Sequence, residues 1–228
     1  MTEKINPKQI AGECAAGYVQ SNTTVGLGTG STAYYALKKL GERVAEGLSI
    51  RGVPTSQQSH DLAIEFGIPL TDFSAIEHID LTIDGADEID RDFNLTKGGG
   101  GALLREKIVA AATVREIIVG DESKMCQSLG AFPLPVEVTP FGWQATLGHL
   151  AALGCDPVLR KSDSKPFVTD NGNYIIDCPF GSIDEPKLLE GRVNGVSGVV
   201  DCGLFCGLAH HVIIGRSDGT CQELTGHG

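Results

Sequence analysis

The sequence of 228 residues contains no run approaching the ~18 consecutive apolar residues that a membrane-spanning helix needs. Basic residues are also scarce: 18 Lys and Arg stand against 29 Asp and Glu, for a formal net charge of −11. General binding to nucleic acid or to an anionic membrane surface favours a basic chain, so we expect neither partner. The first residues, MTEKINPKQ, are polar and lack the apolar core of a secretory signal. We therefore expect a cytoplasmic protein.

The sequence also lacks a C-x-x-C motif and a C-x-x-C…H-x-x-x-H type of zinc spacing. Its seven cysteines are an odd number in a chain long enough to bury a core without cross-links, so we expect most of them to be free thiols in a reducing cytoplasm. His210 and His211 are adjacent in a strand-like segment. Neighbouring strand residues point to opposite faces, so we expect no metal site there.

The first half of the chain alternates between helical and strand-like patterns. Predicted helices cover residues 11–18, 33–44, a segment around 61–66, and 102–112, and predicted strands cover residues 23–27, 49–53, 79–83 and 116–119. Strands separated by helices need crossover connections. The pattern predicts an α/β fold with a mostly parallel, Rossmann-like sheet covered by helices on both faces.

The pattern changes after the segment FPLP at residues 132–135. A helix over 143–153 ending near Gly154, a hairpin of strands 167–169 and 174–176 around the turn DNGN, a helix over 184–190, and strands over 199–205 and 212–214 are predicted. We interpret this half as a smaller α+β domain spanning residues 131–205. Residues 1–130 and about 206–228 then form the large domain that carries the active site.

A glycine-rich segment, GLGTGST, joins the first predicted strand to a helix. Glycines allow close approach of a ligand, and a helix start offers N–H groups and a positive dipole end, which suits a phosphate. The candidate phosphate residues are Thr29, Gly30, Ser31 and Thr32. A dinucleotide site would need an acidic residue about twenty positions on, where residues 53–55 offer none, and no G-x-x-x-x-G-K-[ST] motif occurs. A purely structural turn is the remaining alternative.

An acidic segment, DGADEID, directly follows the strand predicted at 79–83. Ligands of open α/β sheets bind beside the carboxyl ends of the strands, where Asp84, Gly85, Ala86 and Asp87 are expected. The spacing does not match a calcium loop, because the positions that require Gly and Glu hold Leu95 and Gly101. The carboxylates are candidates for binding sugar hydroxyls or moving protons. The simpler interpretation is a solvated acidic loop.

A third segment, KGGGGALLREK, places four glycines before a helix. Such a run costs conformational entropy, which favours a loop built for close backbone approach to a ligand. Its candidate residues are Lys97, Gly98, Gly99 and Gly100, with Glu106 at the edge of the helix's apolar stripe. In an apolar setting a glutamate becomes a better general base. Glu106 could equally be a surface residue, and Lys97 a solvated lysine.

Together these three motifs resemble the type A ribose-5-phosphate isomerase family. Further segments, REIIV with SK, FPLPVEV and VTDNGN, match the same family in the same order, so the resemblance covers nearly the whole chain. It implies Glu106 as the base that moves a proton between carbons 1 and 2, and Asp84 and Asp87 as contacts to sugar hydroxyls that assist ring opening. It also implies Lys97 and Lys124 in the substrate site, residues 29–32 at the phosphate, no metal or organic cofactor, and a homodimer or homotetramer.

Two positions depart from the family pattern: Gly101 stands where alanine is common, and His210-His211 where Ala-Asp is usual. Neither affects an implied catalytic residue. Two other functions remain as alternatives. A sugar-phosphate-sensing domain would be expected to carry a helix-turn-helix and a basic patch, and a nicotinamide-dependent dehydrogenase would be expected to have the missing ribose-binding acid. The resemblance favours an enzyme that interconverts ribose 5-phosphate and ribulose 5-phosphate through an enediolate.

Overall fold

The computed structural model describes residues 5–226, which divide into two compact units. The large unit comprises the residues up to Ala86, Arg105–Met125 and the residues from Gly207 onward; the small unit comprises Asp87–Leu104 and Cys126–Cys206. The first four residues of the predicted polar N-terminus and residues 227–228 of the predicted large domain lie outside the described residues. The domain limits drawn from the sequence stay a prediction.

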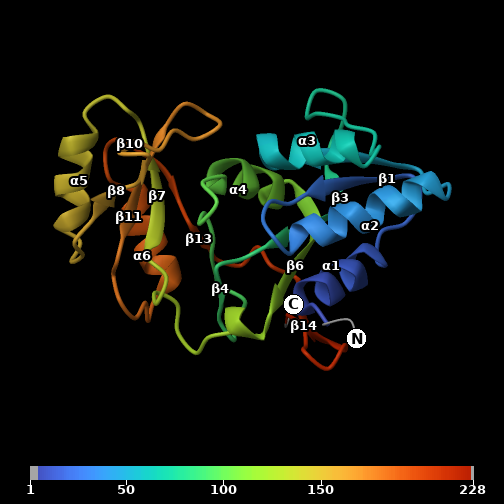
Figure 1. The fold of residues 1–228 in the computed structure, drawn as a ribbon. Coiled ribbons are helices and arrows are strands. Elements are labelled where there is room, and N and C mark those ends of the chain that lie inside the picture. Colours follow the sequence, from blue (N-terminus) through green and yellow to red (C-terminus); the bar gives the residue numbers. More distant parts are fainter. Residues whose placement is uncertain (1–4, 227–228) are drawn as a thin grey trace. The chain divides into compact units, whose positions relative to one another are not determined.

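The large unit is built on one sheet with the strand order β15-β14-β6-β3-β1-β2 (Figure 1). Five of these strands run parallel, and β15 pairs antiparallel with β14 at one edge. This arrangement confirms the predicted Rossmann-like α/β fold. The strands are β1 (Thr23–Leu27), β2 (Ile50–Pro54), β3 (Ile79–Gly85), β6 (Thr113–Asp121), β14 (His211–Gly215) and β15 (Cys221–Thr225).

Helices cover both faces of this sheet. On one face, Val25 and Leu27 of β1 belong to a buried cluster that includes Ala11 of α1 and Leu37 of α2. On the other face, a Cβ at Gly26 would lie 2.8 Å from Val109 of α4, so glycine permits close packing there. Burial on both faces explains the apolar strands. The helices are α1 (Pro7–Ala16), α2 (Ala33–Ala45), α3 (Gln57–Glu65) and α4 (Leu103–Ala111), and a 3-10 turn covers Glu122–Lys124.

The small unit combines short antiparallel sheets with two helices. One sheet has the order β12-β7-β11-β8, and it packs Val136 and Ile176 in a buried cluster with Leu150 of α5 and Val193 of α6. Smaller sheets have the orders β13-β5-β4 and β10-β9. The elements are β4 (Glu88–Ile89), β5 (Leu95–Thr96), β7 (Leu134–Val138), α5 (Trp143–Ala151), β8 (Val158–Leu159), β9 (Lys161–Ser162), β10 (Lys165–Pro166), β11 (Tyr174–Cys178), α6 (Pro186–Asn194), β12 (Val199–Cys202) and β13 (Leu204–Phe205).

Two predicted strands of the small unit differ in the structure. The strand predicted at 199–205 is divided between β12 and β13, which lie in different sheets. Gly203 separates them: its N–H donates to Pro135 O at 2.7 Å, and a Cβ there would lie 2.1 Å from Lys97 O. The strand predicted at 167–169 is reduced to one bridge between Val168 and Tyr174. Close backbone packing, which no periodicity reveals, causes the first difference.

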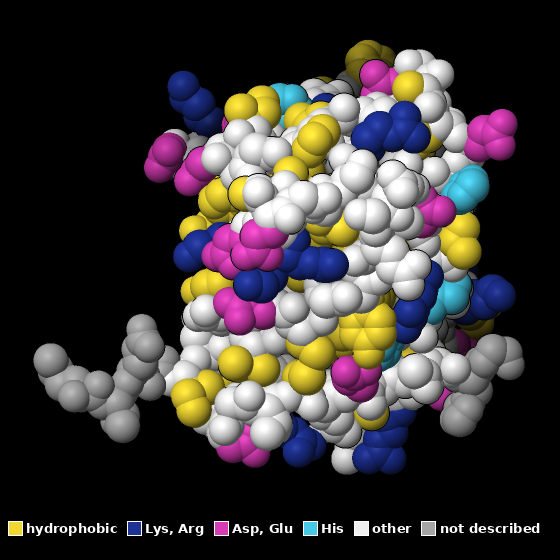
Figure 2. All heavy atoms as spheres, turned by 90° about the vertical axis from the view of Figure 1, so that its right-hand side faces the viewer, with side chains coloured by type: hydrophobic (Ala, Val, Ile, Leu, Met, Phe, Trp, Pro, Cys, Tyr) yellow, Lys and Arg dark blue, Asp and Glu magenta, His cyan; other side chains and the backbone are white. Residues whose placement is uncertain are grey.

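The described helices include none that is both long and apolar enough to cross a membrane. On the face that Figure 2 displays, acidic and basic side chains are interspersed with uncharged ones.

Candidate active site

The predicted phosphate loop leaves the carboxyl end of β1 and leads into α2. Gly28 is required at its start, because a Cβ there would lie 2.4 Å from both Ile83 O and the Oδ1 of Asp84. Thr29 Oγ1 donates to Ser56 Oγ at 2.7 Å, and Gly30 has φ +107°. Thr32 is the N-cap of α2, and its side chain makes no capping hydrogen bond. The loop therefore presents hydroxyls at the positive end of a helix dipole.

A cation that the sequence analysis missed lies at this loop. Lys8, in the first turn of α1, donates from its Nζ to Ser31 Oγ at 2.9 Å. Lys8 belongs to no motif and precedes Ser31 by 23 residues, so spacing gave no signal for it. An ammonium group beside Ser31 adds the positive charge that an incoming phosphate dianion would need.

Asp84 lies at the carboxyl end of β3 and is only 1% exposed. Its Oδ1 accepts the N–H of Thr29 at 2.9 Å and the N–H of Gly85 at 2.7 Å. The interpretation of a solvated acidic loop is thus wrong for Asp84. In the sheet, β1 lies between β2 and β3, so the chain moves to one side after β1 and to the other side after β2. The loop after β1 and the loop after β3 therefore meet at the position where the strand order reverses. Such switch points are where open α/β sheets bind ligands.

Lys124 and Glu106 complete the predicted residues of the large unit. Lys124 follows β6, the neighbour of β3, so it lies at the same carboxyl edge as Thr29 and Asp84. Glu106 is in the first turn of α4 and is 6% exposed, which contradicts the alternative of a surface glutamate. Ile108 of the same helix is half exposed instead, so the buried face of α4 runs through Leu103, Glu106 and Ala110.

The small unit holds Asp87, Lys97 and the glycine loop. Gly99 donates its N–H to Asp87 Oδ2 at 2.7 Å, and a Cβ there would lie 2.6 Å from Asp87 Oδ1, so a side chain at this position would have to displace the carboxylate. Lys97 is 3% exposed, with its Nζ 5.4 Å from the ring centre of Phe205. Lysines are almost never this buried, so the interpretation of Lys97 as a solvated lysine is wrong.

Gly101, which departs from the family pattern, is explained by its surroundings. Its φ is +82°, a conformation that favours glycine, and a Cβ would lie 2.4 Å from the ring of Phe167. Gly98 also has a positive φ, +101°. The first and last glycines of the run therefore have backbone conformations that residues with side chains rarely adopt.

Arg160 is a second residue that the sequence analysis missed. Its guanidinium donates to the carbonyls of Gly98 at 2.8 Å and Gly99 at 3.1 Å. The opposite side of the same group binds Asp177 through two bonds, at 3.0 and 2.5 Å. Holding these carbonyls constrains the direction of the peptide N–H groups in the loop. Arg160 is separated from the loop by about sixty residues and carries no motif, so only the fold reveals this contact.

Only one of the two histidines lies in a strand, because β14 begins at His211 and His210 precedes it. His210 accepts the N–H of Glu116 on its Nδ1 at 3.1 Å, whereas His211 is buried and contacts Arg115 on its own Nδ1 at 3.0 Å. The two rings therefore serve different neighbours.

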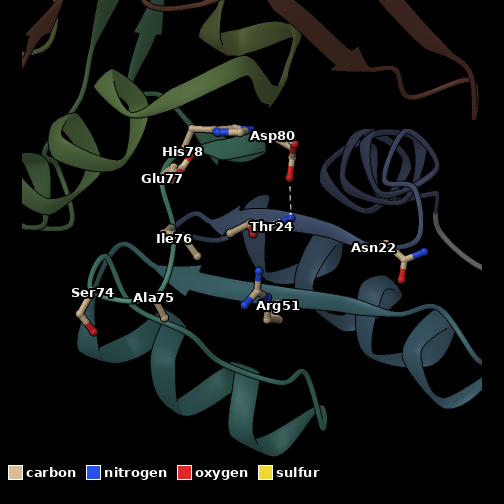
Figure 3. Close-up of a pocket in the computed structure, with 9 residues that line it drawn as sticks. All are labelled: Asn22, Thr24, Arg51, Ser74, Ala75, Ile76, Glu77, His78 and Asp80. Carbon is tan, nitrogen blue, oxygen red and sulfur yellow. Dashed lines mark hydrogen bonds and ion pairs between the residues drawn. The ribbon is translucent and has the colours of Figure 1, made fainter.

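A polar cavity of about 490 Å³ lies at the opposite edge of the large sheet (Figure 3). Its lining includes Thr24, Arg51 and Asp80, near the amino ends of β1, β2 and β3, and Asp80 Oδ2 accepts the Thr24 N–H at 2.7 Å. None of the predicted site residues lines it. The motifs thus mark the carboxyl edge of the sheet, not this cavity.

The large unit is a Rossmann-like α/β fold with polar loops at the carboxyl edge of its sheet. Comparison with known proteins narrows this class. The family model for ribose 5-phosphate isomerase A (phosphoriboisomerase A) matches residues 51–219. Ribose-5-phosphate isomerase A of Bacillus mycoides (strain KBAB4) is 52% identical over 216 residues, covering 94% of this chain and 98% of the relative.

Two solved structures agree with this match. The ribose 5-phosphate isomerase of Plasmodium falciparum superposes with a TM-score of 0.93 at 40% identity, covering 97% of this chain and 98% of that one. A D-ribose-5-phosphate isomerase solved in complex with phospho-erythronic acid gives a TM-score of 0.93 at 38% identity, covering 97% of this chain and 100% of that one. The chain belongs to the ribose 5-phosphate isomerase A family.

Proposed function

We propose that the protein is an isomerase that interconverts ribose 5-phosphate and ribulose 5-phosphate, with Glu106 as the base. The observation that carries this proposal is the burial of Glu106 on the helix that follows the glycine loop, in a chain of this family. A carboxylate shielded from water on a rigid element is the arrangement that general-base catalysis requires.

The phosphate end of the substrate binds at the carboxyl edge of the large sheet. Thr29, Gly30, Ser31 and Thr32 supply hydroxyl and backbone donors, and Lys8 and Lys124 supply positive charge. Support comes from the Lys8–Ser31 bond and from the place of Lys124 after the neighbouring strand. Ammonium groups and a helix start together favour a dianion.

The sugar end of the substrate contacts groups from the two motifs that follow the phosphate loop in the sequence. Asp84 and Asp87, flanking Gly85 and Ala86, bind sugar hydroxyls and assist opening of the furanose ring. They are three positions apart in the chain, so their Cα atoms are at most about 11 Å apart.

The chemical step is a proton transfer between neighbouring carbons. Glu106 removes the proton from carbon 2 of the open-chain aldose, and the electron pair moves to the carbonyl oxygen on carbon 1, forming an enediolate. Lys97 and the N–H groups of Gly98, Gly99 and Gly100 stabilise the developing negative charge. Glu106 returns the proton to carbon 1 while a proton passes from oxygen 2 to oxygen 1, which leaves the ketone on carbon 2.

This reaction is an internal oxidation and reduction: carbon 2 is oxidised as carbon 1 is reduced. The electrons balance within the substrate, so we expect no redox cofactor, and the base needs no metal. We also expect a homodimer or homotetramer in the cytoplasm, which light scattering on the purified protein and fractionation of its host would test.

The experiment for this proposal is a coupled assay on the purified chain with ribose 5-phosphate, with and without a chelator and without added nicotinamide cofactor. Ketose formation that is unchanged by the chelator is expected. Activity that vanishes with the chelator and returns with one divalent ion would contradict the metal-free mechanism.

A further inference from the structure

Two cysteines of the large unit lie against each other although 207 positions separate them. The Sγ atoms of Cys14, in α1, and Cys221, at the start of β15, are 2.8 Å apart. Both side chains are partly buried and pack against the cluster that covers the sheet face beneath α1. They are therefore held by the fold and still reachable from solvent.

The surroundings of the pair are polar. The Cys14 thiol donates to Glu223 Oε1 at 3.7 Å, and Glu223 Oε2 accepts the hydroxyl of Tyr18. His211 Nε2 lies 3.3 Å from the same carboxylate oxygen. Burial, the hydrogen bond with Cys221 and the nearby carboxylate raise the pKa of Cys14 to about 12.

The distance between the two sulfur atoms distinguishes a metal site from a disulfide at these residues. Cys14, Cys221 and Glu223 could together offer ligand atoms to a metal ion, since these atoms lie within 4.8 Å of one another. Two thiolates on one tetrahedral zinc ion, each about 2.3 Å from the metal, lie about 3.8 Å apart. The observed 2.8 Å is shorter, and it is within an ångström of a covalent S–S bond of about 2.05 Å.

We propose that Cys14 and Cys221 form a reversible disulfide that ties helix α1 to the edge strand β15. The oxidant is a low-molecular-weight disulfide of the glutathione class. One cysteine thiolate attacks a sulfur of oxidised glutathione and expels one glutathione thiolate, leaving a mixed disulfide. The second cysteine thiolate attacks the protein sulfur of that mixed disulfide and expels the other. The protein loses two electrons and two protons, and two reduced glutathione molecules form.

The disulfide stabilises the edge of the sheet. β15 is bound to the sheet on one side, by β14, so the link to α1 gives it a second attachment. Closing a long loop restricts the unfolded chain. For a chain of this size, oxidation is expected to raise the Tm by about 5–10 °C.

Peptide mapping of the full chain tests the proposal. The protein is incubated with oxidised glutathione, its remaining thiols are alkylated, and it is digested with trypsin without reduction. Cleavage after Lys and Arg places Cys14 in the peptide 9–38 and Cys221 in the peptide 217–228. The expected product is these two peptides joined, two hydrogens lighter than their sum, and absent after dithiothreitol.

The variants Cys14→Ser and Cys221→Ser are each expected to abolish both the linked product and the rise in Tm. Cys126→Ser removes another partly buried cysteine, from the small unit, and is expected to keep both. Alkylation or separate glutathionylation of Cys14 and Cys221 in the oxidised wild type would overturn the proposal. So would stoichiometric Zn²⁺ binding by the reduced protein that depends on both cysteines, if no linked peptide forms.

Discussion

The N–H of Thr29 donates to Oδ1 of Asp84 at 2.9 Å, and this bond joins two motifs that lie 55 residues apart in the chain. Gly28 makes the contact possible, since any Cβ there would overlap Asp84. The phosphate loop and the first acid of the DGAD motif are therefore one assembled structure. A change at Asp84 that keeps this acceptor is expected to act on chemistry with the loop still in place.

Replacing Asp84 with Asn tests this relationship. The amide keeps one oxygen that can accept the Thr29 N–H, so the Tm is expected to change by only a few degrees, whereas turnover falls about a hundredfold or more through loss of the carboxylate. The matched control is Asp80→Asn on the same strand, because Asp80 accepts the Thr24 N–H at 2.7 Å at the opposite edge. The control should retain turnover within about twofold of wild type, given the small effect of changes remote from the chemistry. Equal losses in both variants would refute a role specific to Asp84.

Lys8→Met tests the cation that the motifs did not reveal. Loss of a charged contact to the phosphate is expected to lower kcat/KM for ribose 5-phosphate about ten- to a hundredfold. Any slow reaction of unphosphorylated ribose should be unaffected. Lys39→Met serves as the control, because Lys39 is exposed and paired with Glu42 at 3.0 Å on α2. If Lys8→Met lowers kcat/KM for ribose 5-phosphate and for ribose by the same factor, Lys8 does not bind the phosphate.

Arg160→Lys tests positioning of the glycine loop. An ammonium group cannot reach the carbonyls of Gly98 and Gly99 while also holding Asp177 with two bonds. Misaligned loop N–H groups should lower kcat about tenfold, with KM nearly unchanged, because they act on the enediolate more than on bound substrate. Asp177→Asn should change kcat in the same direction, and Arg192→Lys on α6 is the control. A change in KM alone would show that the loop binds substrate and does not stabilise the enediolate.

The buried imidazole of His211 predicts a dependence of stability on pH. Burial, then the adjacent Arg115, lower the pKa of His211 below 6.5, while Glu223 opposes the shift. Tyr18 packs edge-on against the ring at 5.2 Å. Because the folded pKa lies below the unfolded one, this contribution to stability is fully present above about pH 6.5 and is lost as the pH falls toward the folded pKa. The Tm measured from pH 7.5 to 5 should fall less steeply in His211→Asn than in wild type. Parallel curves would contradict this assignment.

Short sequence patterns predicted the helices and strands of the large unit and its motifs, because these features depend on residues that are close together in the chain. The strand predicted at 23–27 is observed with the same limits, and the helix predicted at 143–153 is observed over Trp143–Ala151. The contacts of Lys8 and Arg160 depend on side chains brought together by the fold, so no spacing could predict them. The division of residues 199–205 at Gly203 has the same origin, since it depends on the backbone of Lys97.

The burial of the Glu106 side chain could likewise not be predicted from the sequence. Its position at the edge of an apolar stripe allowed either a surface or a buried side chain, and the apolar spacing did not reveal that Ile108 of the same helix is half exposed. Which face of a short helix becomes buried depends on the sheet and loops packed against it.

The most direct test of the account is the turnover of Glu106→Gln with ribose 5-phosphate, measured beside Glu116→Gln. Glu116 is a matched control, because it is 1% exposed and pairs with Thr82 in the interior of the sheet, away from the carboxyl edge. We predict that kcat of Glu106→Gln falls by about 10²–10⁴, with KM within about threefold, while the folded control keeps its turnover. A Glu106→Gln protein with kcat within about threefold of wild type would contradict the assignment of Glu106 as the base.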